Sequence, residues 1–268
     1  MKKITFIFAL VALASCANKE TKTAAMQDSA SVDDYQAFLE PLREMDLENK
    51  SVQSSLQNKL LALFEKENPK SSLSSYEKMD SMVAMLMTYN ENNSDLMTTA
   101  GMIDYSEVDG ALQEMRLSVL NQLVVSKNPE MNAEILSWST FYNVMLKYCA
   151  KMGHLQYFGG SMAPLMSSGA VDGLLMNRVN DLKSLSGTGN LNSATTQFKE
   201  QIRKNDNYFA PESDSEKEYI NLYKEFIALD AELTSTFSKW VEVRNATNPA
   251  GITQYISTLI NSITPDEL

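Results

Sequence analysis

The sequence predicts an all-α protein, a bundle of about six to eight helices. From about residue 34 onward, apolar residues recur three and four positions apart, which is helical spacing. No segment alternates convincingly between apolar and polar residues, as a half-buried strand does. Only 10 glycines and 7 prolines occur in 268 residues, and 44% of the residues are hydrophobic, which allows a sizeable core. The alternative architecture is an α-solenoid of helix pairs.

Three helices are predicted in the first half of the chain. An apolar stripe over residues 42–63 indicates the first, which ends at Asn68-Pro69 because a proline restricts the residue before it. The second stripe, over residues 76–86, is surrounded by methionines, so this helix is apolar on most faces and central. A third stripe covers residues 112–123.

The next helices follow Asn128-Pro129, which is typical of an N-cap with proline at the first helical position. Apolar residues then recur over residues 131–152 in alternating steps of four and three. The glycine-rich residues 153–169 break this pattern, and residues 171–182 resume it. Residues 191–204 predict a weaker, more polar helix.

The longest predicted helix extends from about Ser213 to Ala246 and forms the spine of the bundle. It carries a four-heptad seam of a and d positions: Tyr219, Leu222, Phe226, Leu229, Leu233, Thr236, Trp240 and Val243. Aromatic residues at e positions widen the stripe, which favours packing in a bundle over a two-stranded coiled coil. Asn248-Pro249 precedes a last helix, which ends at Pro265.

The first sixteen residues have the pattern of an export signal. Lys2 and Lys3 precede eleven mostly apolar residues, about half of the ~20 that a membrane-spanning helix needs. Leu13-Ala14-Ser15-Cys16 closes the segment. It resembles the signal peptide and lipobox of bacterial lipoproteins. The resemblance implies that residues 1–15 are removed and that Cys16 receives acyl chains such as palmitate. An ordinary signal peptide with an incidental cysteine is the alternative.

The resemblance also implies a location. Ala17, and not aspartate, follows Cys16, a pattern similar to that of lipoproteins sorted to the outer membrane. Residues 16–33 contain little to bury and predict a flexible tether that carries the lipid. Residues 34–268 are expected to form a single helical domain. Whether that domain faces the periplasm or the cell surface stays open.

The net charge excludes some partners. Without residues 1–15 the chain has 21 basic and 34 acidic residues, a net charge of −13. This disfavours nucleic acid, whose phosphates must be neutralised by Lys and Arg. It also disfavours direct adsorption to anionic lipid heads, so contact with the membrane is expected through the lipid on Cys16.

Few residues suggest catalysis, and neither a metal nor a cofactor is expected. His154 is the only histidine, which excludes di-iron bundle sites and zinc sites with several histidines. A single histidine still permits a Ser-His-Asp triad, but the sequence has no Gly-x-Ser-x-Gly turn to accompany it. Cys149 lies on the apolar stripe of its helix and is expected in the core. Methionines 79, 82, 85 and 87 predict core packing; an adaptable groove and a copper site are the alternatives.

The best candidate for a ligand site is the glycine-rich segment 153–161. Its glycines permit sharp turns, its aromatic residues could stack on a ligand, and its polar residues could form hydrogen bonds. The candidate ligand-binding residues are His154, Gln156, Tyr157, Phe158 and Ser161. The alternative is a connection between helices whose aromatic residues fill the core.

Two functions follow from these observations. The first is a non-catalytic binding or scaffold module for an envelope protein or glycan, which an exposed groove between helices would support. The second is a hydrolase-like envelope enzyme with its site near residues 153–161 and His154 as a weak catalytic candidate. A carboxylate within hydrogen-bond reach of His154 would support the enzyme.

Overall fold

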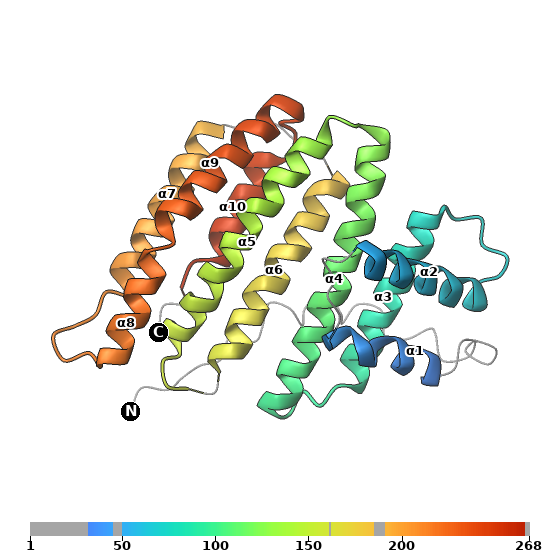
Figure 1. The fold of residues 1–268 in the computed structure, drawn as a ribbon, viewed down its shortest axis with the longest axis horizontal. Coiled ribbons are helices and arrows are strands. Elements are labelled where there is room, and N and C mark those ends of the chain that lie inside the picture. Colours follow the sequence, from blue (N-terminus) through green and yellow to red (C-terminus); the bar gives the residue numbers. More distant parts are fainter. Residues whose placement is uncertain (1–31, 45–49, 161, 185–190, 266–268) are drawn as a thin grey trace, which may run out of the picture.

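The computed structural model describes residues 32–44, 50–160, 162–184 and 191–265, and these residues form an all-α, multi-helix bundle, as the sequence predicts (Figure 1). The helices are α1 (Val32–Leu39), the 3-10 helix η1 (Glu40–Glu44), α2 (Lys50–Glu67), α3 (Ser75–Asn93), α4 (Thr99–Lys127), α5 (Met131–Gln156), α6 (Ala163–Ser184), α7 (Leu191–Tyr208), α8 (Lys217–Ile227), α9 (Asp230–Thr247) and α10 (Ile252–Ser262). No helix among the described residues combines the length and apolarity that crossing a membrane requires.

The predicted spine over residues 213–246 is wrong, because this stretch forms two helices, α8 and α9. At the junction the backbone N–H of Leu229 donates to the carbonyl of Phe226, 3.1 Å away, a tighter i to i−3 bond that interrupts the α-helical ladder. The longest described helix is instead α4, with 29 residues. The ten α-helices of the described residues exceed the predicted six to eight, and α1 begins within the predicted tether at Val32.

Two hydrophobic cores meet along α4. The first joins α1, η1, α2 and α3 to the middle of α4. The second joins α5 to α10 with the C-terminal part of α4. Figure 1 shows α4 between α3 and α6, and it packs against both. Helices distant in sequence also pack together, such as α10 with α6, whereas a solenoid repeat contacts its sequence neighbours.

A buried charge network joins three helices of the second core. It contains Glu134 on α5, Arg178 and Asp181 on α6, and Arg244 on α9. The Arg178 guanidinium binds both oxygens of Glu134, at 2.9 and 2.6 Å. Arg244 donates to Glu134 at 3.2 Å and to Asp181 at 2.9 Å. Two positive and two negative charges are therefore compensated inside the protein.

Neighbouring groups complete the network. Trp240 donates its indole N–H to Glu134 at 2.7 Å, and Arg244 donates to the carbonyl of Ala250 at 2.9 Å. Burial by itself would raise the pKa of Glu134, but Arg178 and Arg244 lower it, so this carboxylate stays ionised. Burial raises the pKa of Asp181 despite the same two arginines.

A second pair of carboxyl groups joins α7 to the start of α9. Asp206 and Asp230 interact with each other, and their buried Oδ1 atoms receive no hydrogen bond from another donor among the described residues. Burial, and then the charge of Asp206, raise the pKa of Asp230 to about 7. Tyr223 on α8 donates to the backbone carbonyl of Asp206 at 3.2 Å, so this pair lies beside the junction of α8 and α9.

We predict that Glu134→Gln destabilises the protein by about 3–5 kcal/mol, because it leaves two buried guanidinium groups without their shared partner. Urea unfolding followed by circular dichroism measures this loss. Glu242→Gln, at an exposed position on α9, is the matched control and should stay within about 0.5 kcal/mol of the wild type. An equal, small effect of both substitutions would contradict the role assigned to the network.

We predict that Asp230→Asn stabilises the protein at pH 8 more than at pH 5. In the folded protein the pKa of Asp230 is raised from 3.8 to about 7. Protonation of Asp230 therefore stabilises the folded state in full below pH ~4, and this stabilisation is lost as the pH rises through 7. Since Asp230 is partly exposed, we expect the stabilisation by Asp230→Asn to be only about 1 kcal/mol larger at pH 8 than at pH 5. Urea midpoints at both pH values measure it, with Asp214→Asn, at an exposed position, as the control. A pH-independent difference between variant and wild type would contradict the assignment.

Candidate functional site

The predicted ligand segment 153–161 is partly helical in the structure. Helix α5 continues to Gln156, past the predicted break at the buried Gly153. His154 is exposed, and its Nδ1 donates to the carbonyl of Ala150, 2.7 Å away on the same helix. This is the only hydrogen bond of His154 among the described residues, so the carboxylate partner that the enzyme hypothesis needs is not shown there.

The other candidate residues of this segment lie at the end of α5 or follow it. Gln156 and Tyr157 are half-buried, and the Nε2 of Gln156 has no hydrogen-bond partner among the described residues. Phe158 is 37% exposed and lies edge-on to Tyr219 of α8, with 5.3 Å between ring centroids. Ser161 lies outside the described residues, as does Cys16. Ligand binding by residues 153–161 and lipidation of Cys16 stay predictions.

The sulfur-containing residues pack in the cores. Cys149 is fully buried, and burial raises the pKa of its thiol to about 12, so it stays protonated. Met79 and Met82 are buried in the first core, and Met85 and Met87 pack against it. The predicted core packing of these residues is confirmed.

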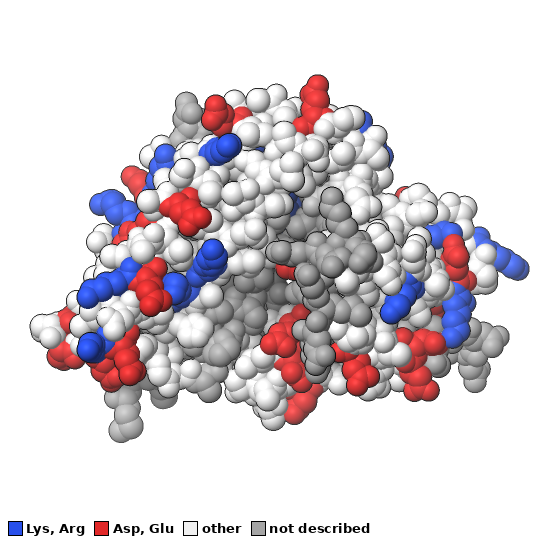
Figure 2. All heavy atoms as spheres, in the orientation of Figure 1, with Lys and Arg blue, Asp and Glu red and all other residues white. Residues whose placement is uncertain are grey.

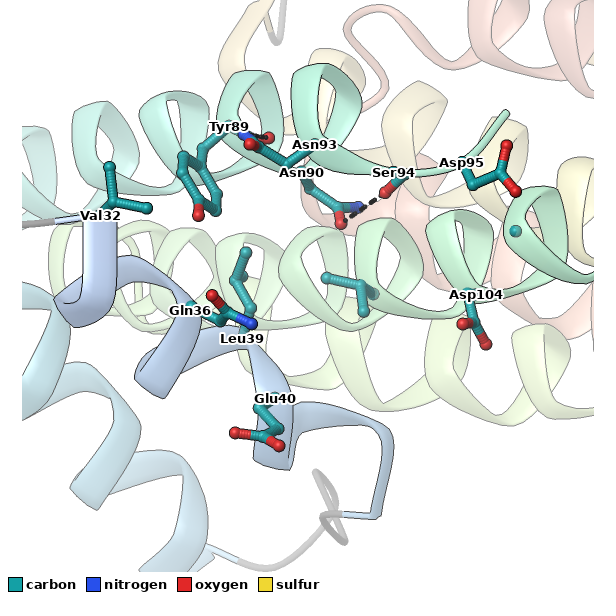
Figure 3. A pocket seen from close by; sticks show the side chains of 12 residues that line it. Val32, Gln36, Leu39, Glu40, Tyr89, Asn90, Asn93, Ser94, Asp95 and Asp104 are labelled. Carbon is teal, nitrogen blue, oxygen red and sulfur yellow. Dashed lines mark hydrogen bonds between the residues drawn. The ribbon is translucent and has the colours of Figure 1, made fainter. Parts of the chain in front are cut away.

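A pocket of about 500 Å³ lies between α1, the end of α3 and the beginning of α4 (Figure 3). It combines carboxylates, amides, a tyrosine ring and aliphatic side chains. The lining residues are Val32, Gln36, Leu39, Glu40, Tyr89, Asn90, Asn93, Ser94, Asp95, Gly101, Asp104 and Val108. This volume falls in the range of small-molecule sites, and the polar groups can orient a ligand.

Hydrogen bonds fix the wall between α3 and α4. Asn90 is 7% exposed, and its amide donates to the carbonyl of Tyr105 on α4 at 3.1 Å. The hydroxyl of Ser94 donates to the Oδ1 of Asn90 at 3.2 Å, a bond drawn in Figure 3. The amide of Asn90 thus has partners on both sides and holds the end of α3 against α4.

Side-chain hydrogen bonds also fix the connection between α3 and α4. Asp95 accepts from the backbone N–H of Met97 and from the hydroxyl of Thr98, both at 3.1 Å. Thr98 in turn caps α4 by accepting from the N–H of Gly101 at 3.1 Å. Gly101 packs so closely that a Cβ atom there would lie 1.8 Å from the carbonyl oxygen of Asp95.

Helix α1 forms the opposite wall, and contacts with α2 and α3 hold it in place. The hydroxyl of Tyr35 donates to Glu67 on α2 at 2.5 Å, and its ring meets that of Tyr89 edge-on at 5.3 Å. Lys66 on α2 forms an ion pair with Asp34. Burial raises the pKa of Tyr35 well above its ordinary value, so its hydroxyl stays a donor.

The charge of the lining is negative. Glu40, Asp95 and Asp104 are the charged lining residues, and they come from η1, the α3–α4 connection and α4. Among the described residues, no group of three or more His, Cys, Asp or Glu side chains is placed to hold a metal ion. The carboxylates and amides of the lining can orient a ligand by electrostatics and hydrogen bonds.

The sequence patterns do not predict this pocket. They place Val32 in the tether and indicate no role for the connection between the second and third predicted helices. Two signals were present: residues 81–115 contain six acidic residues and no basic one, and Thr98 precedes Gly101 with the spacing of a helix cap. Neither signal shows that α1 lies opposite the α3–α4 wall of the pocket.

No known family model, curated protein or solved structure matches this chain.

We predict that Gly101→Ala destabilises the protein by about 1–3 kcal/mol, because the backbone of Asp95 must move to admit the methyl group. Gly173→Ala is the matched control, since a Cβ atom on Gly173 in α6 meets open space. We expect Gly173→Ala to stabilise the protein by about 0.5–1 kcal/mol, because alanine lowers the entropy of the unfolded chain. Thermal unfolding measures both, and the same sign for the two variants would contradict the close approach.

Proposed function

We propose that this protein is a membrane-tethered envelope lipoprotein whose helical domain binds an envelope protein or glycan at the α1–α3–α4 pocket without catalysing a reaction. Residues 1–15 direct export, and lipid on Cys16 anchors the mature chain in the outer membrane. The pattern of Lys2, Lys3, the apolar run and the lipobox supports the anchor.

The single observation that carries the binding role is the pocket. Its volume of about 500 Å³ suits a ligand. Its walls are held by bonds that do not involve a ligand, such as those of Asn90 to Tyr105 and Ser94. A preformed site loses little conformational entropy when it binds, so such walls favour affinity.

The position of α1 links the pocket to the anchor. This helix lines the pocket and begins at Val32, directly after residues 16–31 of the predicted tether. A fully extended chain of this length spans at most about 55 Å. The pocket would therefore stay within that distance of the membrane and would sample ligands at the envelope surface.

Site-specific photocrosslinking in living cells tests the proposal. A benzophenone amino acid replaces Gln36 or Asn93 in the pocket, or Lys239 at an exposed position of α9 as the control. We expect a discrete protein or glycan adduct from both pocket positions and none from the control. Adducts that are absent from the pocket, or equal at the control position, would contradict the binding role.

The same cells test the anchor. Wild-type protein should incorporate an alkyne-labelled palmitate and sediment with the outer membrane, because acyl chains on Cys16 bury many methylene groups in the bilayer. Cys16→Ser should lose the label and the adduct together. Retention of the label in this variant would contradict lipidation at Cys16.

A further inference from the structure

We infer that the hydrogen-bonded carboxyl pair of Asp206 and Asp230 is a pH-sensitive switch that controls the docking of α8. With one proton between the two groups, α8 stays packed on the bundle, and when that proton is lost, α8 detaches. The inference does not depend on the α1–α3–α4 pocket. It draws on the position of the pair beside a break between two helices and on the contacts that hold α8.

The pair lies where the chain passes from α8 into α9. Asp230 is the first residue of α9 and directly follows the junction at residues 228–229. Asp206 lies in the last turn of α7, which packs against α9. Asp230 carries the proton and donates it to Asp206. Separation of the two side chains would therefore move the start of α9 away from α7, and with it the junction from which α8 extends.

Two tyrosines from other helices lie close to the pair. The charges of Asp206 and Asp230 act on Tyr148 of α5 and on Tyr223 of α8. Burial is the main cause that raises the pKa of both hydroxyls, and the charges of the pair add to it. Both tyrosines therefore stay neutral near pH 7 and cannot balance a second negative charge on the pair.

No cation compensates the pair among the residues that the structure describes. Lys151 on α5 is bound instead to Glu225 of α8, with 2.6 Å between Nζ and Oε2. Arg203 and Lys204 of α7 and Lys224 of α8 are exposed, and α10 contains no charged residue. Two ionised carboxylates in contact repel each other, and partial burial strengthens the repulsion because water screens it less.

The proton is lost near neutral pH. Burial, and then the charge of Asp206, raise the pKa of Asp230 from 3.8 to about 7. Once α8 has detached and the pair has separated, Asp230 would regain its ordinary pKa of about 4. The packed state of α8 is therefore favoured in full below pH ~4. Its advantage is lost as the pH rises through 7, and it changes little above that value.

Few contacts hold α8 against this repulsion. Of its residues, all of which the structure describes, only Phe226 is buried, where it packs on Tyr148 and Phe209. The hydroxyl of Tyr223 donates to the backbone carbonyl of Asp206 at 3.2 Å, so this contact depends on the same residue as the switch. Figure 2 shows charged side chains of both signs over the end of the molecule where Figure 1 places α8. Detachment would leave this solvated face unchanged and would expose the aromatic rings beneath it.

Hydrogen exchange of the natively processed protein at pH 5 and pH 8 tests the inference. Protection factors remove the intrinsic effect of pH on exchange, and the amides of α3 serve as an internal reference. Asp230→Asn keeps a donor for Asp206 at every pH and is the first test variant. Asp206→Asn, the second, removes the repulsion from the other side. Glu232→Gln, at an exposed position in the first turn of α9, is the matched control.

In the wild type we expect the protection factors of α8 to fall about fivefold from pH 5 to pH 8, since the pair is only half-buried. Those of α3 should change by less than about twofold. Asp230→Asn should abolish the fall in α8, Asp206→Asn should reduce it, and Glu232→Gln should retain it.

Three results would overturn the inference. Protection of α8 that is absent at pH 5 or does not change with pH in the wild type would show that no switch operates. A fall that persists in both Asp230→Asn and Asp206→Asn would show that other groups cause it. An equal fall in α3 and α8 would show that pH acts on the whole bundle and not on the docking of α8.

Discussion

The structure depends on one electrostatic constraint, the compensation of two buried arginines by two buried carboxylates. Removing such charges from water costs several kcal/mol for each ion, and this cost is met only where every charge finds a partner. Glu134, Arg178, Asp181 and Arg244 satisfy the condition at one point, with the side chains of both arginines fully buried. Helices α5, α6 and α9 must therefore keep a fixed register, because a shift of one residue in any of them would leave a charge unpaired.

This fixed bundle positions the pocket through α4. The C-terminal part of α4 belongs to the second core and packs on α6, while its earlier turns carry α3 and face η1. Two walls of the pocket are thus attached to a rigid element by the bonds of Asn90, Asp95 and Thr98. The third wall, α1, has eight residues and is held mainly by Tyr35 and its neighbours. It is the wall that a ligand would affect most.

Apolar periodicity predicts much of this fold and little of the pocket. The regular stripe from Met131 to Met152 lies within α5, because one buried face repeats at helical spacing. The same reasoning failed at residues 228–229, since Phe226 and Leu233 are both fully buried and the seam continues through the break. Periodicity also cannot show that Glu134 meets Arg244, 110 positions away, or that α1 faces Asp104 across a pocket. Such contacts depend on tertiary packing.

Hydrogen exchange of the natively processed protein, with and without the protein or glycan that photocrosslinking identifies at the pocket, tests the central claim most directly. The account predicts slower exchange of the amides in α1, because a ligand that contacts Glu40, Tyr89 and Asp104 joins this helix to α3 and α4. Amides of α5, α6 and α9 around the buried charge network should not change. Slower exchange confined to the end of α5 and to α8, with α1 unaffected, would contradict the account and would favour residues 153–161 as the binding site.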